Sequence, residues 1–317
     1  MRRVVWMLVV AVVSTVSVGL VSQEATGLHP DKPWAFPSRI EKPFPEDDAP
    51  KTLPGSMRTY TMAQIDDLSN PPDWYPDQHP TPPPIVVKGH GGAMACGACH
   101  LMSGLGHPES SDLTGLSAEY IVQQMADFKS GARKDPTGKR MNGIAVEATD
   151  EDVRQAAQYI AALPRRAFQK VTEADMAPRT ALRNGRMRYL AEEGGTEPIG
   201  GRIITVPEDP ARARLRDPNS GFVSYVPRGS LARGKAIVET GGGRTVMCTV
   251  CHGNDLKGLG KVPRLAGMHP IYTVRQLHWF KDGTRNGADA AQMKPVADPL
   301  TDEDIVAVSA YLGSLAP

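Results

Sequence analysis

The four cysteines of this 317-residue chain stand in two copies of one short motif. The copies are Cys96-Gly-Ala-Cys99-His100 and Cys248-Thr-Val-Cys251-His252. In a Cys-x-x-Cys-His sequence the two thiols lie about one helical turn apart, so both can form thioether bonds to one haem while the adjacent imidazole binds the iron. The motifs therefore predict two covalently bound haem c groups, with His100 and His252 as iron ligands.

Other cysteine chemistry fits the pattern less well. Zinc is often bound by Cys-x-x-Cys pairs, but both pairs would have to meet at one ion, whereas each pair here has its own following His. A thioredoxin-like redox pair would need a βαβ context, and Pro and Gly dominate the residues upstream. No further thiol is present for a disulfide framework or a nucleophile.

An internal repeat extends well beyond the two motifs. It pairs residues without gaps at a constant offset of 152, from Cys96–Leu163 to Cys248–Leu315. Identical pairs include Tyr120/Tyr272, Gln124/Gln276, Phe128/Phe280, Arg133/Arg285 and Tyr159/Tyr311. The block Thr-Asp-Glu-Asp at 149–152 recurs at 301–304. We infer a duplicated domain.

The repeat also selects candidates for the second axial ligand of each iron. Isolated methionines usually fill cores, and those at other positions in the repeat align with a different residue type. Met141 and Met293 align with each other, and each follows its motif His by 41 residues. We predict that both bind iron from a loop that crosses the opposite haem face. His107 and His269 are the alternative ligands.

Helices are expected at equivalent places in the two copies. One begins at Ser117 or at His269-Pro270 and ends at Gly131 or Gly283, where the apolar periodicity stops. Another begins at Thr149 or Thr301, whose hydroxyl can cap a helix that starts with three acidic residues.

The rest of the chain divides by composition. Residues 30–84 carry half of the 28 prolines and should be extended or irregular, although their aromatic residues predict that part of them packs. Strand-like runs at 202–206 and 221–226 predict a small β element. We divide the chain into a signal or membrane anchor (1–27), a Pro-rich spacer (28–84), a first domain (85–165), a connecting segment (166–228) and a second domain (229–317).

The N-terminus carries an export signal. Met1-Arg2-Arg3 precedes an apolar run over residues 4–21, which is long for a cleaved signal and close to the length that spans a bilayer. We expect a retained membrane helix with both domains on the periplasmic side of the bacterial cytoplasmic membrane, and a soluble periplasmic protein after cleavage is the alternative. A net charge of +1 with interspersed signs argues against a nucleic-acid partner.

The order of these features resembles the class I cytochrome c family: a Cys-x-x-Cys-His motif, a helix ending in Phe-Lys-x-Gly-x-Arg, a Met segment and a capped final helix. The duplication resembles the two-domain dihaem cytochromes of bacterial respiratory chains. The resemblance covers about residues 85–163 and 230–317 and implies an all-α fold for each domain, with an exposed haem edge. The first helix before Cys96 should be much shorter than its counterpart near Ser230, because Pro82-Pro83-Pro84 precedes it.

The expected function is single-electron transfer between redox proteins or respiratory complexes, without catalysis, because two six-coordinate irons leave no open position for a substrate. Two alternatives stay open. One is a dihaem oxidoreductase, such as a peroxidase or an enzyme oxidising sulfur compounds. The other is a haem subunit fixed in a larger complex.

Overall fold

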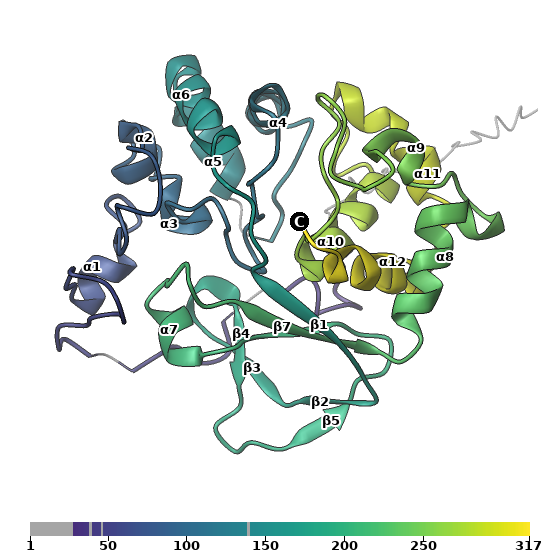
Figure 1. Ribbon diagram of the computed structural model, residues 1–317, viewed down its shortest axis with the longest axis horizontal. Coiled ribbons are helices and arrows are strands. Elements are labelled where there is room, and N and C mark those ends of the chain that lie inside the picture. Colours follow the sequence, from purple (N-terminus) through teal and green to yellow (C-terminus); the bar gives the residue numbers. More distant parts are fainter. Residues whose placement is uncertain (1–27, 38–39, 46, 138–139) are drawn as a thin grey trace, which may run out of the picture.

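The computed structural model describes residues 28–37, 40–45, 47–137 and 140–317. Two helical bundles stand next to each other on a layer of short β-strands (Figure 1). We call the bundle of residues 85–165 unit 1 and that of residues 229–317 unit 2. The bundles confirm the class I cytochrome architecture expected from the sequence, and the β layer belongs to the connecting segment.

The two units contain equivalent helices. Unit 1 is made of α2 (Pro84–Val87), α3 (Gly97–His100), α4 (Ala118–Ser130), α5 (Arg140–Glu147) and α6 (Asp150–Ala161). Unit 2 is made of α8 (Ser230–Thr240), η2 (Gly241–Gly243), α9 (Thr249–His252), α10 (Pro270–Lys281), η3 (Ala288–Gln292), α11 (Lys294–Ala297) and α12 (Asp302–Ser314). In unit 2 the motif helix lies between longer helices from before and after it, whereas in unit 1 the preceding helix α2 is as short as the motif helix.

Local sequence signals account for the helix ends. Thr149 and Thr301 each form a capping box with the Asp three residues later, and the acidic first turns suit the positive end of the helix dipole. Ser117 caps α4 at its start, and Gly131 ends that helix with a φ of 78°, a left-handed conformation that glycine adopts without strain. The expected boundaries are confirmed.

The first helices differ as the prolines predicted. Helix α2 has four residues after Pro83, whereas α8 has eleven. The short α2 still buries Ile85 and Val86 in the core of unit 1, but it leaves part of that unit to be covered by other chain segments.

The connecting segment forms the β layer. Its main sheet has the order β1-β7-β6, with β1 (Gln169–Ala174) parallel to β7 (Phe222–Pro227) and β6 (Ile204–Pro207) antiparallel to it. Two hairpin-like pairs join β2 (Met176–Pro178) to β5 (Thr196–Pro198) and β3 (Thr180–Leu182) to β4 (Arg188–Leu190). The short helices η1 (Asn184–Arg186) and α7 (Pro210–Arg214) complete the segment. The two expected strands are confirmed within one or two residues, and the others lacked a clear alternation in the sequence.

The Pro-rich segment is largely packed. Helix α1 (Met62–Asp66) places Ile65 in a small core with Leu53, Trp74 and Tyr75. The Trp74 indole donates a hydrogen bond to the carbonyl of Leu215 at 2.7 Å, which ties this core to the connecting segment. The prediction that the aromatic residues would pack is therefore confirmed.

The N-terminal segment expected to enter a membrane, residues 1–27, lies outside the described residues. Among the described helices, none has the length and apolar character that a bilayer crossing requires.

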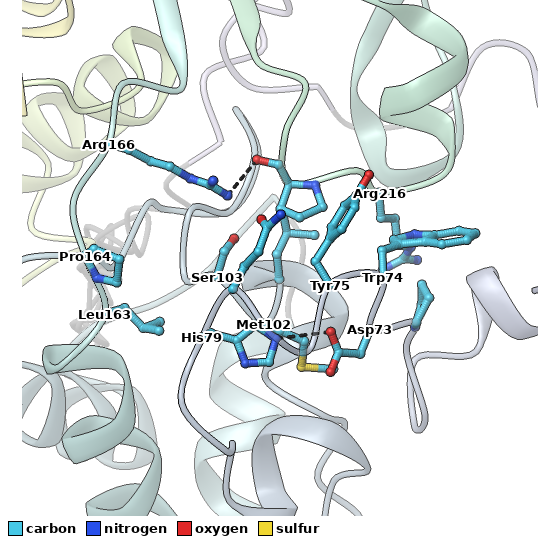
Figure 2. A pocket seen from close by; sticks show the side chains of 14 residues that line it. Asp73, Trp74, Tyr75, His79, Met102, Ser103, Leu163, Pro164, Arg166 and Arg216 are labelled. Carbon is cyan, nitrogen blue, oxygen red and sulfur yellow. Dashed lines mark hydrogen bonds and ion pairs between the residues drawn. The ribbon is translucent and has the colours of Figure 1, made fainter. Parts of the chain in front are cut away.

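A small cavity of about 50 Å³ marks where the Pro-rich segment covers unit 1 (Figure 2). Its lining includes His79, whose Nε2 lies 3.1 Å from the Asp73 carboxylate, and Met102, two residues after the first motif helix. The His79 ring also meets the edge of Tyr159 in α6 at 6.3 Å between ring centres. The hydrogen bond to Asp73 raises the pKa of His79 above its usual range.

This contact predicts a pH-dependent stability. Because the pKa of His79 is raised by folding, its ion pair with Asp73 stabilises the folded state below a pH of about 6.5, and that contribution is lost as the pH rises through the folded-state pKa. In urea unfolding between pH 5.5 and 8, His79→Gln should flatten this part of the profile. Asp73→Asn should flatten it equally, and a wild-type slope in both variants would contradict the assignment.

Candidate functional site

Both motifs lie on one-turn helices that bring the cysteines and histidines together. The thiols are not joined to each other in disulfides. Burial raises the pKa of Cys96 to about 12 and that of Cys248 to about 11, so neither is a thiolate at neutral pH. No group of three or more metal-binding side chains occurs in the described part of the chain.

The two motif histidines are held in the same way. The Nδ1 atom of His100 lies 2.9 Å from the carbonyl oxygen of Ser111, and that of His252 lies 2.7 Å from the carbonyl oxygen of Pro263. Ser111 and Pro263 are equivalent in the repeat. Since a carbonyl can only accept, Nδ1 carries the proton and Nε2 is left with its lone pair for a metal.

Burial favours the same protonation state. It lowers the pKa of His100 and of His252, because the charged imidazolium loses its hydration. Both rings are therefore neutral at physiological pH and able to bind iron.

Met141 faces the same cavity as the first motif. Cys99, His100 and Met141 all line a space of about 430 Å³ in unit 1, whose other walls include Tyr120 and Phe128. The expectation of a loop at Met141 is wrong, because Met141 is the second residue of α5. The following residue, Asn142, donates to the carbonyls of Phe128 at 2.7 Å and Arg133 at 2.8 Å, which anchors the start of α5 to the end of α4.

Met293 occupies the equivalent place in unit 2. It lies between η3 and α11 and is half-buried against the unit 2 core, against which Cys248 also packs. The next residue, Lys294, donates to the carbonyl of Lys281 at 2.7 Å, at the end of α10. In both units, then, the residue after the methionine ties its segment to the end of the preceding long helix.

The alternative histidines have other surroundings. His107 lines the same cavity as His100 and lies only seven residues after it, on the short turn that leads away from the motif. His269 is the N-cap of α10, as expected, and its Nδ1 lies 3.2 Å from the Gln169 side chain of the connecting segment. Neither position repeats in the other unit.

A network of identical residues joins the two units, and sequence reasoning did not assign it a role. Arg133 donates to Gln124 at 2.8 Å in its own unit and to Tyr272 at 3.1 Å across the contact. By symmetry, Arg285 donates to Gln276 at 2.8 Å and to Tyr120 at 2.7 Å. Each guanidinium also stacks on the phenylalanine of its own unit, at 4.5 and 4.6 Å from the ring centres of Phe128 and Phe280. The same residues were already visible as identical pairs at the repeat offset.

This network leaves buried donors without acceptors. Among the described residues, the Nε atoms of Arg133 and Arg285 and the side-chain nitrogen of Gln276 have no hydrogen-bond partner. Arg133, Gln276 and Tyr272 also line the unit 1 cavity. Buried donors of this kind need acceptors, and the two carboxylates of a haem would supply charged ones. The cavity, the paired thiols and these donors together fit a covalently bound haem.

The two motifs differ in how far they are covered. In unit 2, Val250 is 58% exposed beside Cys251, and Val246, Met247 and Leu259 are exposed as well. The unit 1 counterpart of Val250 is Ala98, which is 2% exposed. Its carbonyl accepts a hydrogen bond from Arg216 of the connecting segment. We call the exposed residues 246, 247 and 250, which stand in or directly before the second motif, the unit 2 patch.

Comparisons with known proteins agree with this geometry. The cytochrome c family model matches residues 231–316. A cytochrome c4 from Pseudomonas aeruginosa is 28% identical over 235 residues, covering 73% of this chain and 88% of the relative. A cytochrome c-554(548) from Halomonas halodenitrificans is 41% identical over 68 residues, covering 21% of this chain and 82% of the relative. A thiosulfate dehydrogenase electron acceptor from Stutzerimonas stutzeri is 26% identical over 226 residues, covering 70% of this chain and 80% of the relative.

The symmetry of the network predicts matched mutational effects. Tyr272→Phe and Tyr120→Phe each remove one acceptor of a buried guanidinium nitrogen, which keeps a glutamine acceptor of the other unit, Gln276 or Gln124. Each change should therefore lower the free energy of unfolding by about 1.5–3 kcal/mol, and by similar amounts. Urea unfolding of the haem-loaded protein measures both. Tyr311→Phe, which loses an exposed hydrogen bond to Glu239, is the control and should cost less than about 1 kcal/mol. A strongly unequal pair would argue against equivalent contacts.

Proposed function

This chain belongs to the class I c-type cytochromes, as a two-domain member with two covalently bound haems, and from this premise we propose that it carries single electrons between periplasmic redox partners. The observation that carries the proposal is the pairing of the two units. Each has its own thioether cysteines and a neutral, carbonyl-held histidine, and the buried donors of both units meet at their contact.

We assign His100 and Met141 to one iron and His252 and Met293 to the other. Support comes from the shared cavity of Cys99, His100 and Met141, and from the equivalent anchoring of both methionines. With these four side chains as ligands, the two irons would have no position left for a substrate, which favours an electron carrier over a dihaem oxidoreductase. When bound, each haem supplies a one-electron iron couple. The protein supplies the axial ligands, the carboxylate-binding arginines and the exclusion of water.

We propose that partners dock on the unit 2 patch. A redox partner must approach the thioether edge of a haem, and the connecting segment and the Pro-rich segment cover that edge in unit 1. There, Arg216 binds the Ala98 carbonyl, and the amide of Ala95 donates to the carbonyl of Leu68. The equivalent positions of unit 2 are open and apolar. Its nearby charges are mixed, as in the ion pair of Lys261 with Asp289, so the fitting partner is a redox protein with a nearly neutral, apolar rim.

A second role, as the haem subunit of a larger complex, is favoured by the connecting segment. One relative is named as the electron acceptor of a thiosulfate dehydrogenase. An enzyme of sulfur-compound oxidation is therefore our candidate donor. We place both units in the periplasm, either on the retained N-terminal segment or released after its cleavage.

The ligand assignment predicts a spectroscopic change. In the oxidised protein, Met141→Ala and Met293→Ala should each remove about half of the weak sulfur-to-iron band at the red end of the visible spectrum, and each should lower the potential of one haem, because axial ligands set it. Met125→Ala is the control, since Met125 also lines the unit 1 cavity but has Leu277 as its counterpart. A full band in both ligand variants would refute the assignment.

The docking proposal predicts a kinetic difference between two matched valines. Val250→Glu should slow electron exchange with a small class I cytochrome c about tenfold, which corresponds to losing about 1.4 kcal/mol of association free energy. Stopped-flow absorbance measures this rate. Val146→Glu is the control, because Val146 is 57% exposed on α5 of unit 1. Reduction by dithionite should be the same in both variants, and equal slowing by both would exclude docking at the patch.

A further inference from the structure

A buried ion pair joins the two units at another point of their contact. Asp112 of unit 1 and Arg264 of unit 2 approach to 2.5 Å, and they are 2% and 1% exposed. The two residues are equivalent in the repeat, since 264 minus 112 is the offset of 152. Duplicated positions thus meet each other at the centre of the contact, and they carry opposite charges.

Both side chains of the pair form further hydrogen bonds. Asp112 accepts from the amide and the hydroxyl of Thr114 at 2.9 and 2.8 Å. Arg264 donates to the carbonyl of Thr114 at 2.5 Å and to that of Ala266 at 2.6 Å. Thr114 and Ala266 are again equivalent in the repeat. Each charge is held by both units.

Each member of the pair also directly follows the residue whose carbonyl holds a motif histidine. Asp112 directly follows Ser111, whose carbonyl holds the His100 ring, and Arg264 directly follows Pro263, whose carbonyl holds the His252 ring. The peptide groups that position the two axial imidazoles are therefore attached to the two members of one ion pair.

A contribution to folding stability does not by itself explain why a buried ion pair occupies these positions. Removing two charges from water costs several kcal/mol per ion, and apolar residues of similar volume often give equal or greater stability. Burial accordingly raises the pKa of Asp112, while Arg264 opposes that shift. A pair of opposite charges between two redox centres has a different effect that apolar residues cannot supply, because it distinguishes two otherwise similar sites.

We propose that the Asp112–Arg264 pair sets the difference between the two haem potentials and, through the adjacent carbonyls, the positions of His100 and His252. The carboxylate is part of the loop that holds His100, so it favours the oxidised iron in unit 1 and keeps that haem at the lower potential. The guanidinium is part of the loop that holds His252 and acts in the opposite direction there. Both residues are positioning residues, because neither contacts an iron ligand side chain directly.

The near-twofold symmetry provides the test. In Asp112→Asn/Arg264→Gln the contribution of the pair to the potential difference should vanish. In Asp112→Arg/Arg264→Asp the two charges exchange places, so the contribution of the pair should reverse its sign. The potential difference should then change in the same direction as in the neutral variant and by about twice as much. Spectroelectrochemical titration of the haem-loaded protein measures both potentials. Thr114→Val is the control, because it removes the hydroxyl's hydrogen bonds with Asp112 and Arg264 but keeps both charges. Its potential difference should stay at the wild-type value.

Other outcomes would overturn the inference. An unchanged difference in both double variants would show that the pair does not tune the haems, and two potentials that move together would show only a loosened contact. If the exchanged pair failed to bind two haems, the neutral pair would decide, since its amides can keep the Thr114 hydrogen bond. The inference rests on the proposed ligands His100 and His252. An error in those ligands would appear in the absorption spectrum, whereas failure of this inference would leave the spectrum intact.

Discussion

The need to bury cationic side chains between the two units shapes the rest of the molecule. Arg133 and Arg285 are 6% and 8% exposed, and Arg264 is the largest of the fully buried side chains. Buried charge is unfavourable unless it is paired and hydrogen-bonded, so tyrosines, glutamines, carbonyls and carboxylates surround these groups. The units can satisfy the arginines only in contact with each other. Their relative placement is therefore determined by the polar network as much as by apolar packing.

The connecting segment covers one unit more than the other. The duplicated units alone would present two similar haem edges, but a short α2 leaves unit 1 open at the side that the β layer and the Pro-rich core then cover (Figure 1). Trp74 and Arg216 join these coverings to each other and to the first motif. The proline run at 82–84 thus has a consequence for function, because a shortened helix leads to a covered edge.

Much of this could be predicted from the sequence, for identifiable reasons. The motifs and the capping boxes are local signals that occur in both copies of the repeat. The aligned methionines are a signal of the same kind, and their role as iron ligands stays a prediction. What could not be predicted depended on contacts between distant residues: the helix around Met141, most strands of the connecting segment, and the partners of Arg133 and Arg285. The repeat did show those arginines as identical pairs, but it could not show that they face each other.

The contact between Asp112 and Arg264 could not be predicted from the sequence either. Identity at the repeat offset marked the shared functions, so a position occupied by Asp in one copy and Arg in the other counted as a mismatch. In a structure where duplicated units face each other around a near-twofold axis, residues near that axis meet their own counterparts. Two different residues at equivalent positions can therefore form a favourable contact there, because an Asp in one unit and an Arg in the other attract each other across the axis. Divergence at such positions is therefore the way in which two similar haem sites can become different.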